Sequence, residues 1–148
     1  FSGDPEVRML SVRGLTAIGA AGAGPLLEKA LTDPHDGVRS EAVAGLAALG
    51  LKTDAIADLL NDPSPRVRLA AVRAAGTLKL TGMAKGAMAL MVDDSAEVRR
   101  AAIEALLRLG ECGTAPSVRQ RLNEWRNRAL RDEFGPPSRE FSLRCIGK

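Results

Sequence analysis

The residue best suited to catalysis or metal binding in this chain is His35, the only histidine, which stands between Asp33 and Asp36. A metal site needs three or four ligands, and no second histidine or thiolate is near His35 in the sequence. A Ser-His-Asp or Cys-His arrangement would also depend on this one histidine. We therefore interpret His35 as a turn residue, and we expect no catalytic, metal-binding or cofactor-binding residue and no cofactor.

The cysteine content and the hydropathy pattern bear on the compartment of the protein. Cys112 and Cys145 are the only cysteines, and neither belongs to a CxxC motif. Isolated cysteines are typical of free thiols in a reducing compartment. No apolar run reaches the roughly 18 residues of a membrane span, and no signal peptide opens the sequence. These features predict a cytoplasmic protein with no membrane span. Separately, because the sequence starts at Phe1 instead of Met, we expect it to be a fragment.

A repeated pattern organises the sequence. An aspartate, a Val-Arg pair five residues later and a following Ala-Val or Ala-Ile occur three times, and a partial first copy has Ser2 in place of the aspartate. The repeated valines, which are 31, 29 and 31 residues apart, are Val7, Val38, Val67 and Val98. A period near 30 residues is typical of solenoid arrays, in which each unit packs only on its neighbours.

Each unit is predicted to contain a long helix with the Val-Arg pair and a shorter second helix. Counted from the valine, offsets 0, 5 and 11 are apolar, which predicts a buried stripe that runs from Val7 to Ile18 in the first unit. Offsets 4 and 7 are small residues, so adjacent long helices can approach closely. Gly14 and Gly45 occupy offset 7 and suggest close contacts, because glycine destabilises a helix interior relative to alanine.

The sequence predicts one array over residues 1–134, followed by a tail over 135–148. The expected units cover about 4–32, 33–61, 62–92 and 93–134, and the last unit contains a long helix from Pro116 to Phe134. Residues 116–148 carry a net charge of +4, and the remaining 115 residues carry −1. The long helix is interpreted as a cap on the array, with a basic patch for an acidic partner or nucleic acid as the alternative. The tail could dock in a groove, bind a partner or remain disordered.

This pattern resembles the HEAT repeat, in particular the short form of about 30 residues first noted in phycobilisome (PBS) lyases. The residues that carry the resemblance are Asp33, Val38 and Arg39; Asp62, Val67 and Arg68; and Asp93, Val98 and Arg99. The resemblance implies an all-α fold: a right-handed, armadillo-type α-α superhelix, or solenoid, of about four helical hairpins with a long C-terminal capping helix.

In HEAT repeats the aspartates and arginines form a structural ladder along the turns between units. The resemblance implies this role for Asp33, Asp62, Asp93, Arg8, Arg39, Arg68 and Arg99. The alternative is a stripe of arginines for phosphate groups, which is disfavoured because each arginine after the first has an aspartate in its own unit.

Three classes of function remain open. Met, Leu and Arg at outward offsets of the long helices favour a non-catalytic scaffold that binds another protein on the inner, concave helix face. The predicted partner-binding residues are Met9, Arg13, Leu69, Arg73, Arg100, Leu107 and Arg108. A bilin lyase or chromophore chaperone is suggested only by the resemblance, and an aromatic content of 3% argues against it. Nucleic-acid backbone binding is the third class, and the net charge of residues 1–115 and the lack of stacking aromatics disfavour it.

Overall fold

Four long helices carry the repeated Val-Arg motif in the computed structural model, which describes residues 3–19 and 22–110. The long helices are α1 (Pro5–Ile18), α3 (Asp36–Ala48), α5 (Pro65–Thr77) and α7 (Ala96–Leu109). The short α-helices are α2 (Ala23–Ala30), α4 (Ala55–Asp58) and α6 (Ala84–Ala89). Short 3₁₀ turns cover Leu59–Asn61, Thr81–Met83 and Leu90–Val92. The described ranges contain no strand, which confirms the predicted all-α class.

Local sequence signals set where the long helices begin. At the start of α1 the Asp4 side chain accepts a hydrogen bond from the Glu6 N–H at 2.9 Å, and Pro5 occupies the first helical position. Before α3, the Nδ1 atom of His35 accepts a hydrogen bond from the Gly37 N–H at 3.2 Å. His35 therefore lies in the turn and caps a helix.

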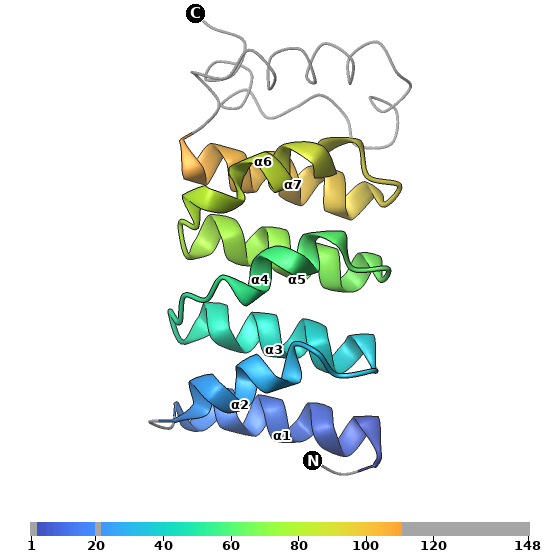
Figure 1. The fold of residues 1–148 in the computed structure, drawn as a ribbon, viewed down its shortest axis with the longest axis vertical. Coiled ribbons are helices and arrows are strands. Elements are labelled where there is room, and N and C mark those ends of the chain that lie inside the picture. The colour runs from blue at the N-terminus through green and yellow to red at the C-terminus, as the bar shows by residue number, and fades with distance from the viewer. Residues whose placement is uncertain (1–2, 20–21, 111–148) are drawn as a thin grey trace, which may run out of the picture.

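The hairpins stack in chain order. Figure 1 shows the four long helices lying side by side, with the short helices α2, α4 and α6 across them toward the viewer. Each long helix packs on the next one, from α1 through α3 and α5 to α7. The result is a helical solenoid, as predicted. The predicted capping helix over 116–134, the tail over 135–148, Cys112 and Cys145 lie outside the described residues.

The core is aliphatic and follows the predicted stripe in the inner units. Val38, Val67 and Val98 are each 0% exposed, and the alanines four residues after them are also fully buried. Small side chains at these positions let the backbones of adjacent long helices approach closely. Leu46 and Leu106 are also fully buried in this core.

The first unit departs from the predicted stripe. Val7 is 46% exposed and Ile18 is 78% exposed, so the expectation that both are buried is wrong. In the inner units the equivalent residues are covered by the preceding unit, and no unit precedes α1 among the described residues. The expectation of a close contact at Gly14 is wrong for the same reason. Apart from the local backbone of its own helix, no described atom lies within 4 Å of the position that its Cβ would take.

Two other glycines do mark close approaches between units. A Cβ on Gly45 of α3 would overlap Oγ1 of Thr16 on α1. A Cβ on Gly76 of α5 would lie 2.9 Å from the Cα of Ala105 on α7. The second contact is with backbone, which cannot move aside by a change of rotamer.

The replacement Gly76→Ala is expected to destabilise the array, although Gly to Ala in a helix interior ordinarily stabilises by about 0.5–1 kcal/mol. The added methyl group would force α5 and α7 apart, at a cost of about 1–3 kcal/mol from overpacking. Thermal unfolding of Gly76→Ala and of the matched control Gly14→Ala measures the effect. Gly14→Ala is expected to raise the melting temperature; a similar rise for Gly76→Ala would show that the two helices do not meet at this point.

Candidate functional site

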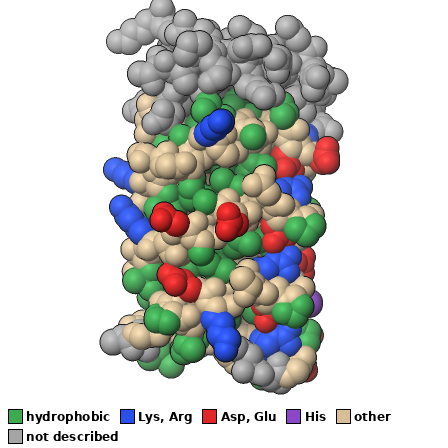
Figure 2. Space-filling model, viewed as in Figure 1, with side chains coloured by type: hydrophobic (Ala, Val, Ile, Leu, Met, Phe, Trp, Pro, Cys, Tyr) green, Lys and Arg blue, Asp and Glu red, His purple; other side chains and the backbone are tan. Residues whose placement is uncertain are grey.

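An ion-paired ladder runs along one edge of the solenoid. In each pair, Nε and Nη2 of an arginine on a long helix donate to the two carboxylate oxygens of the aspartate that opens the next unit. The distances are 2.7 and 2.9 Å for Arg8 and Asp33, 2.8 and 2.8 Å for Arg39 and Asp62, and 2.8 and 3.0 Å for Arg68 and Asp93. Figure 2 shows basic and acidic side chains alternating along its right-hand edge. These bidentate pairs join consecutive units.

The arginines and aspartates of the ladder also form hydrogen bonds with the backbone of the turns. Nη1 of Arg39 donates to the carbonyl oxygens of Asp33 at 2.8 Å and Pro34 at 3.1 Å. Oδ1 of Asp62 accepts the N–H of Ser64 at 2.8 Å. The aspartate in an arginine's own unit therefore supplies its backbone carbonyl, and the carboxylate comes from the following unit. Because Arg39 uses four of its five N–H donors in this way, it has little capacity left for a phosphate group.

The remaining ladder arginines repeat this geometry at the backbone. Nη1 of Arg68 donates to the carbonyls of Asp62 and Pro63 at 2.8 and 3.1 Å. Nη1 of Arg99 donates to the carbonyls of Asp93 and Asp94 at 2.6 and 3.0 Å. A further contact links two turns, since the Ser64 hydroxyl donates to Oδ2 of Asp36 at 2.7 Å.

Hydrogen bonding in the turns favours the ionised form of two carboxylates. The Arg8 guanidinium lowers the pKa of Asp33, against the opposing effect of burial and with help from the His35 N–H. The Ser64 hydroxyl is the main cause that lowers the pKa of Asp36. Both carboxylates are therefore expected to link stability to acid pH.

The free energy of unfolding is expected to fall in acid as these carboxylates become protonated. An aspartate in the unfolded chain has a pKa of about 3.9, so the stabilisation from a lowered folded pKa is fully present well above that value. It is lost as the pH falls through the folded pKa. Urea unfolding between pH 7 and pH 2.5 measures this loss. The variant Asp33→Asn should be less stable at pH 7 and should lose less on acidification; parallel pH profiles for both proteins would contradict the linkage.

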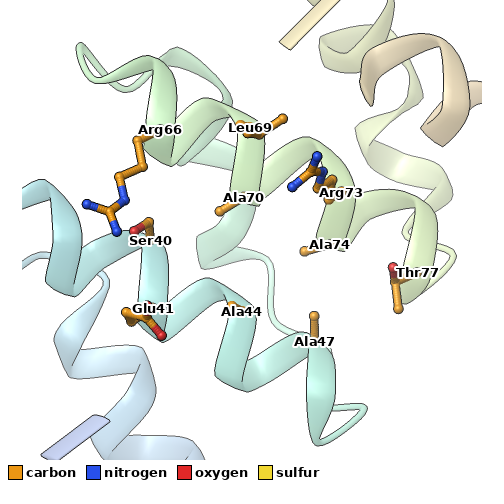
Figure 3. Close-up of a pocket in the computed structure, with 10 residues that line it drawn as sticks. All are labelled: Ser40, Glu41, Ala44, Ala47, Arg66, Leu69, Ala70, Arg73, Ala74 and Thr77. Atoms are coloured by element: carbon orange, nitrogen blue, oxygen red, sulfur yellow. The ribbon is translucent and has the colours of Figure 1, made fainter. Parts of the chain in front are cut away.

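A groove lies between α3 and α5 and is lined by these two long helices alone. Its volume is about 410 Å³. The lining residues are Ser40, Glu41, Ala44 and Ala47 from α3, and Arg66, Leu69, Ala70, Arg73, Ala74 and Thr77 from α5. Figure 3 shows the alanines facing one another across the groove, with Arg66 extending from α5 toward Ser40. We call this the α3–α5 groove; it has a small apolar floor and charged residues at its edges.

The charged residues at this groove differ in whether they form an ion pair. Glu41 is paired with Arg13 of α1, with 2.6 Å between Nη2 and Oε1. Arg66 and Arg73 are exposed, and neither forms an ion pair or a side-chain hydrogen bond within residues 3–19 and 22–110. The groove therefore presents two guanidinium groups whose charge no described carboxylate pairs.

A smaller groove of about 140 Å³ continues the surface between α5 and α7. It is lined by Arg73, Thr77, Ala101, Glu104, Ala105 and Arg108. Arg73 and Thr77 belong to both grooves. The surface of the long helices is thus continuous from Glu41 to Arg108.

The structure brings together only some of the predicted partner-binding residues. Leu69 and Arg73 line the α3–α5 groove, and Arg108 joins Arg73 in the second groove. Arg13 is exposed and reaches this surface through its pair with Glu41, and Arg100 is exposed outside both grooves. Met9 and Leu107 are half-buried and pack against the core.

Sequence reasoning missed Arg66 and misplaced Ser40. Arg66 lies three residues before Leu69 and seven before Arg73, a spacing that places all three on one helix face and could have identified it. Ser40 occupies offset 2 of α3, the outward offset at which Met9 and Leu69 lie in their helices, but it is 7% exposed and its hydroxyl donates to the Gly37 carbonyl at 3.0 Å. The Ser40 side chain lies deep in the groove between α3 and α5, where the neighbouring helix α5 covers it.

The part of the chain that the structure describes contains neither a metal-binding cluster nor a candidate membrane span. No group of three or more His, Cys, Asp and Glu side chains in that part of the chain is placed to hold a metal ion. None of the helices described combines the length and apolarity that crossing a membrane requires.

Comparison with known proteins agrees with the repeat geometry. The family profile described as HEAT repeats matches residues 2–60 and 53–134, which together cover most of the sequence. A search of curated proteins finds no matching relative. Since the profile covers more than half of the chain, this protein belongs to the HEAT-repeat family.

Proposed function

We propose that this protein is a non-catalytic interaction module that binds another protein on the surface of its long helices. HEAT repeats generally serve as protein-interaction scaffolds. The observation that carries the proposal is the α3–α5 groove, which has an alanine floor, the partly exposed Leu69 and the exposed Arg73. Interfaces favour this combination of apolar surface and arginine.

The ladder supports this surface and is proposed to have a structural role. Its arginines are used in bonds to aspartate side chains and turn carbonyls, so they are poor candidates for contacts with a partner. By joining consecutive units, the ladder keeps α3 and α5 at a constant separation. A groove of fixed width then needs little rearrangement on binding, which reduces the entropic cost of association.

The proposal is tested by filling the groove without disturbing the core. The variant Ala44→Arg/Arg73→Glu places a large side chain on the exposed floor and reverses a charge, whereas a change at Leu69 would also remove core packing. We expect unchanged circular dichroism, a free energy of unfolding within about 0.5 kcal/mol and loss of the proteins that the wild type captures from source-cell lysate.

The matched control is Ala48→Arg/Lys85→Glu, which makes the same change in net charge at exposed residues outside both grooves. It should retain the captured proteins. Equal capture by the wild type and the groove variant would move the interaction surface away from the long helices.

A further inference from the structure

We infer that the α3–α5 groove recognises an extended acidic segment of the partner, with its carboxylates held by Arg66 and Arg73. This inference rests on the proposed function and adds the chemistry of the partner. It follows from the charge, the width and the composition of the groove.

The free positive charge at the groove depends on which arginines already bind a carboxylate. Arg8, Arg39 and Arg68 each bind a carboxylate, and Arg13 binds Glu41, the one carboxylate that lines the groove. Arg66 and Arg73 have no such contact within the described ranges. The charge of Arg66 helps to lower the pKa of Asp36, but these two side chains form no ion pair. The groove thus has two guanidinium groups that no described carboxylate binds directly, and carboxylates are the groups that guanidinium binds with two parallel hydrogen bonds.

The width of the groove favours an extended chain. Packed helices have axes about 8–10 Å apart, and a helix with its side chains is about 10–12 Å across, so a helix would rest on the rim. An extended segment is narrower, and a medium-sized apolar side chain can occupy the space above the alanine floor. Arg66 and Arg73 are seven residues apart on α5, or about 10 Å along its axis. Carboxylates two or four residues apart on one side of an extended segment are separated by about 7 or 13 Å, within the reach of both flexible arginines.

The composition of the surface favours a peptide over a nucleic acid. Residues 3–19 and 22–110 contain no Phe, Tyr or Trp on which a base could stack. Glu104 lies beside Arg73 and Arg108 in the second groove and would repel a phosphate backbone that continued along the surface. Three of the ladder arginines, Arg8, Arg39 and Arg68, are already bound to aspartate carboxylates.

The test is selection from a random phage library of linear 12-residue peptides on the whole chain. We expect the selected peptides to be enriched in Asp and Glu relative to the library. A selected peptide, labelled with fluorescein, should bind Arg66→Glu/Arg73→Glu at least about tenfold more weakly at 150 mM salt. Selection on that double variant should favour Lys and Arg instead. The control Lys52→Glu/Lys85→Glu has the same change in net charge at exposed lysines outside the grooves and should bind like the wild type.

Several results would overturn the inference, and they separate it from the proposed function. Selected peptides without acidic enrichment that are still excluded by Ala44→Arg would remove the acidic preference and leave the interaction surface in place. Peptides unaffected by Ala44→Arg would remove both. Failure to select any peptide would exclude an extended-segment site, and equal binding of a single-stranded 20-mer oligonucleotide would show a general polyanion surface.

Discussion

Replacing Asp62 by alanine is expected to lower the free energy of unfolding of the array by about 3 kcal/mol. The Asp62 side chain is only 5% exposed and the Arg39 side chain 13%, so the variant leaves a largely buried guanidinium without its carboxylate. The Ser64 N–H also loses its acceptor. Because stability in a repeat array depends on the interfaces between neighbouring units, the loss acts on the interface between the second and third units. Urea unfolding at pH 7 followed by circular dichroism measures it.

Two companion variants make the Asp62 experiment specific. Asp58→Ala removes an exposed carboxylate of α4 and should change stability by less than about 0.5 kcal/mol. Asp62→Asn keeps an acceptor for the Ser64 N–H and loses the charge, so it should fall between Asp62→Ala and the wild type. Indistinguishable unfolding of Asp62→Ala and Asp58→Ala would mean that the ladder contributes nothing to the interface.

Replacing Ala71 by leucine is the second change for which a large effect is expected. Ala71 is 0% exposed in α5, and the small residue at this height lets the adjacent long helices pack closely. Three additional carbon atoms would displace a neighbouring helix, at a cost of about 1–3 kcal/mol or more. Since the same helices line the α3–α5 groove, the displacement should also weaken partner binding.

Ala48→Leu is the control for this experiment, because Ala48 is exposed on α3. It should leave the melting temperature nearly unchanged. Comparable destabilisation by Ala71→Leu and Ala48→Leu would show that the alanine at offset 4 does not mark a unit interface.

The ladder and the proposed binding surface occupy different parts of the array. The ladder occupies the turns at one edge, and the α3–α5 groove lies along the bodies of the long helices. One set of arginines is fixed by aspartates from the next unit, and the set at the groove has no such pairing in the described ranges. The array therefore separates residues that join consecutive units from residues that are proposed to contact a partner.

The sequence alone determined the repeat, the helices and the burial of the inner valines. These features depend on local spacing: five residues from Asp62 to Val67, and the same offsets repeated in each unit. Helix periodicity turns such spacing into one buried face regardless of what lies beyond the neighbouring unit.

Tertiary structure decided which residues meet across unit boundaries. The unit of Arg39 has its own aspartate, Asp33. Arg39 nevertheless pairs with the carboxylate of Asp62, because stacking brings the turn of the next unit alongside it. Stacking likewise buried Ser40, left Val7 exposed and brought Arg66 to the edge of a groove. Each of these outcomes depends on the presence or absence of an adjacent helix, which the offsets within a single unit do not specify.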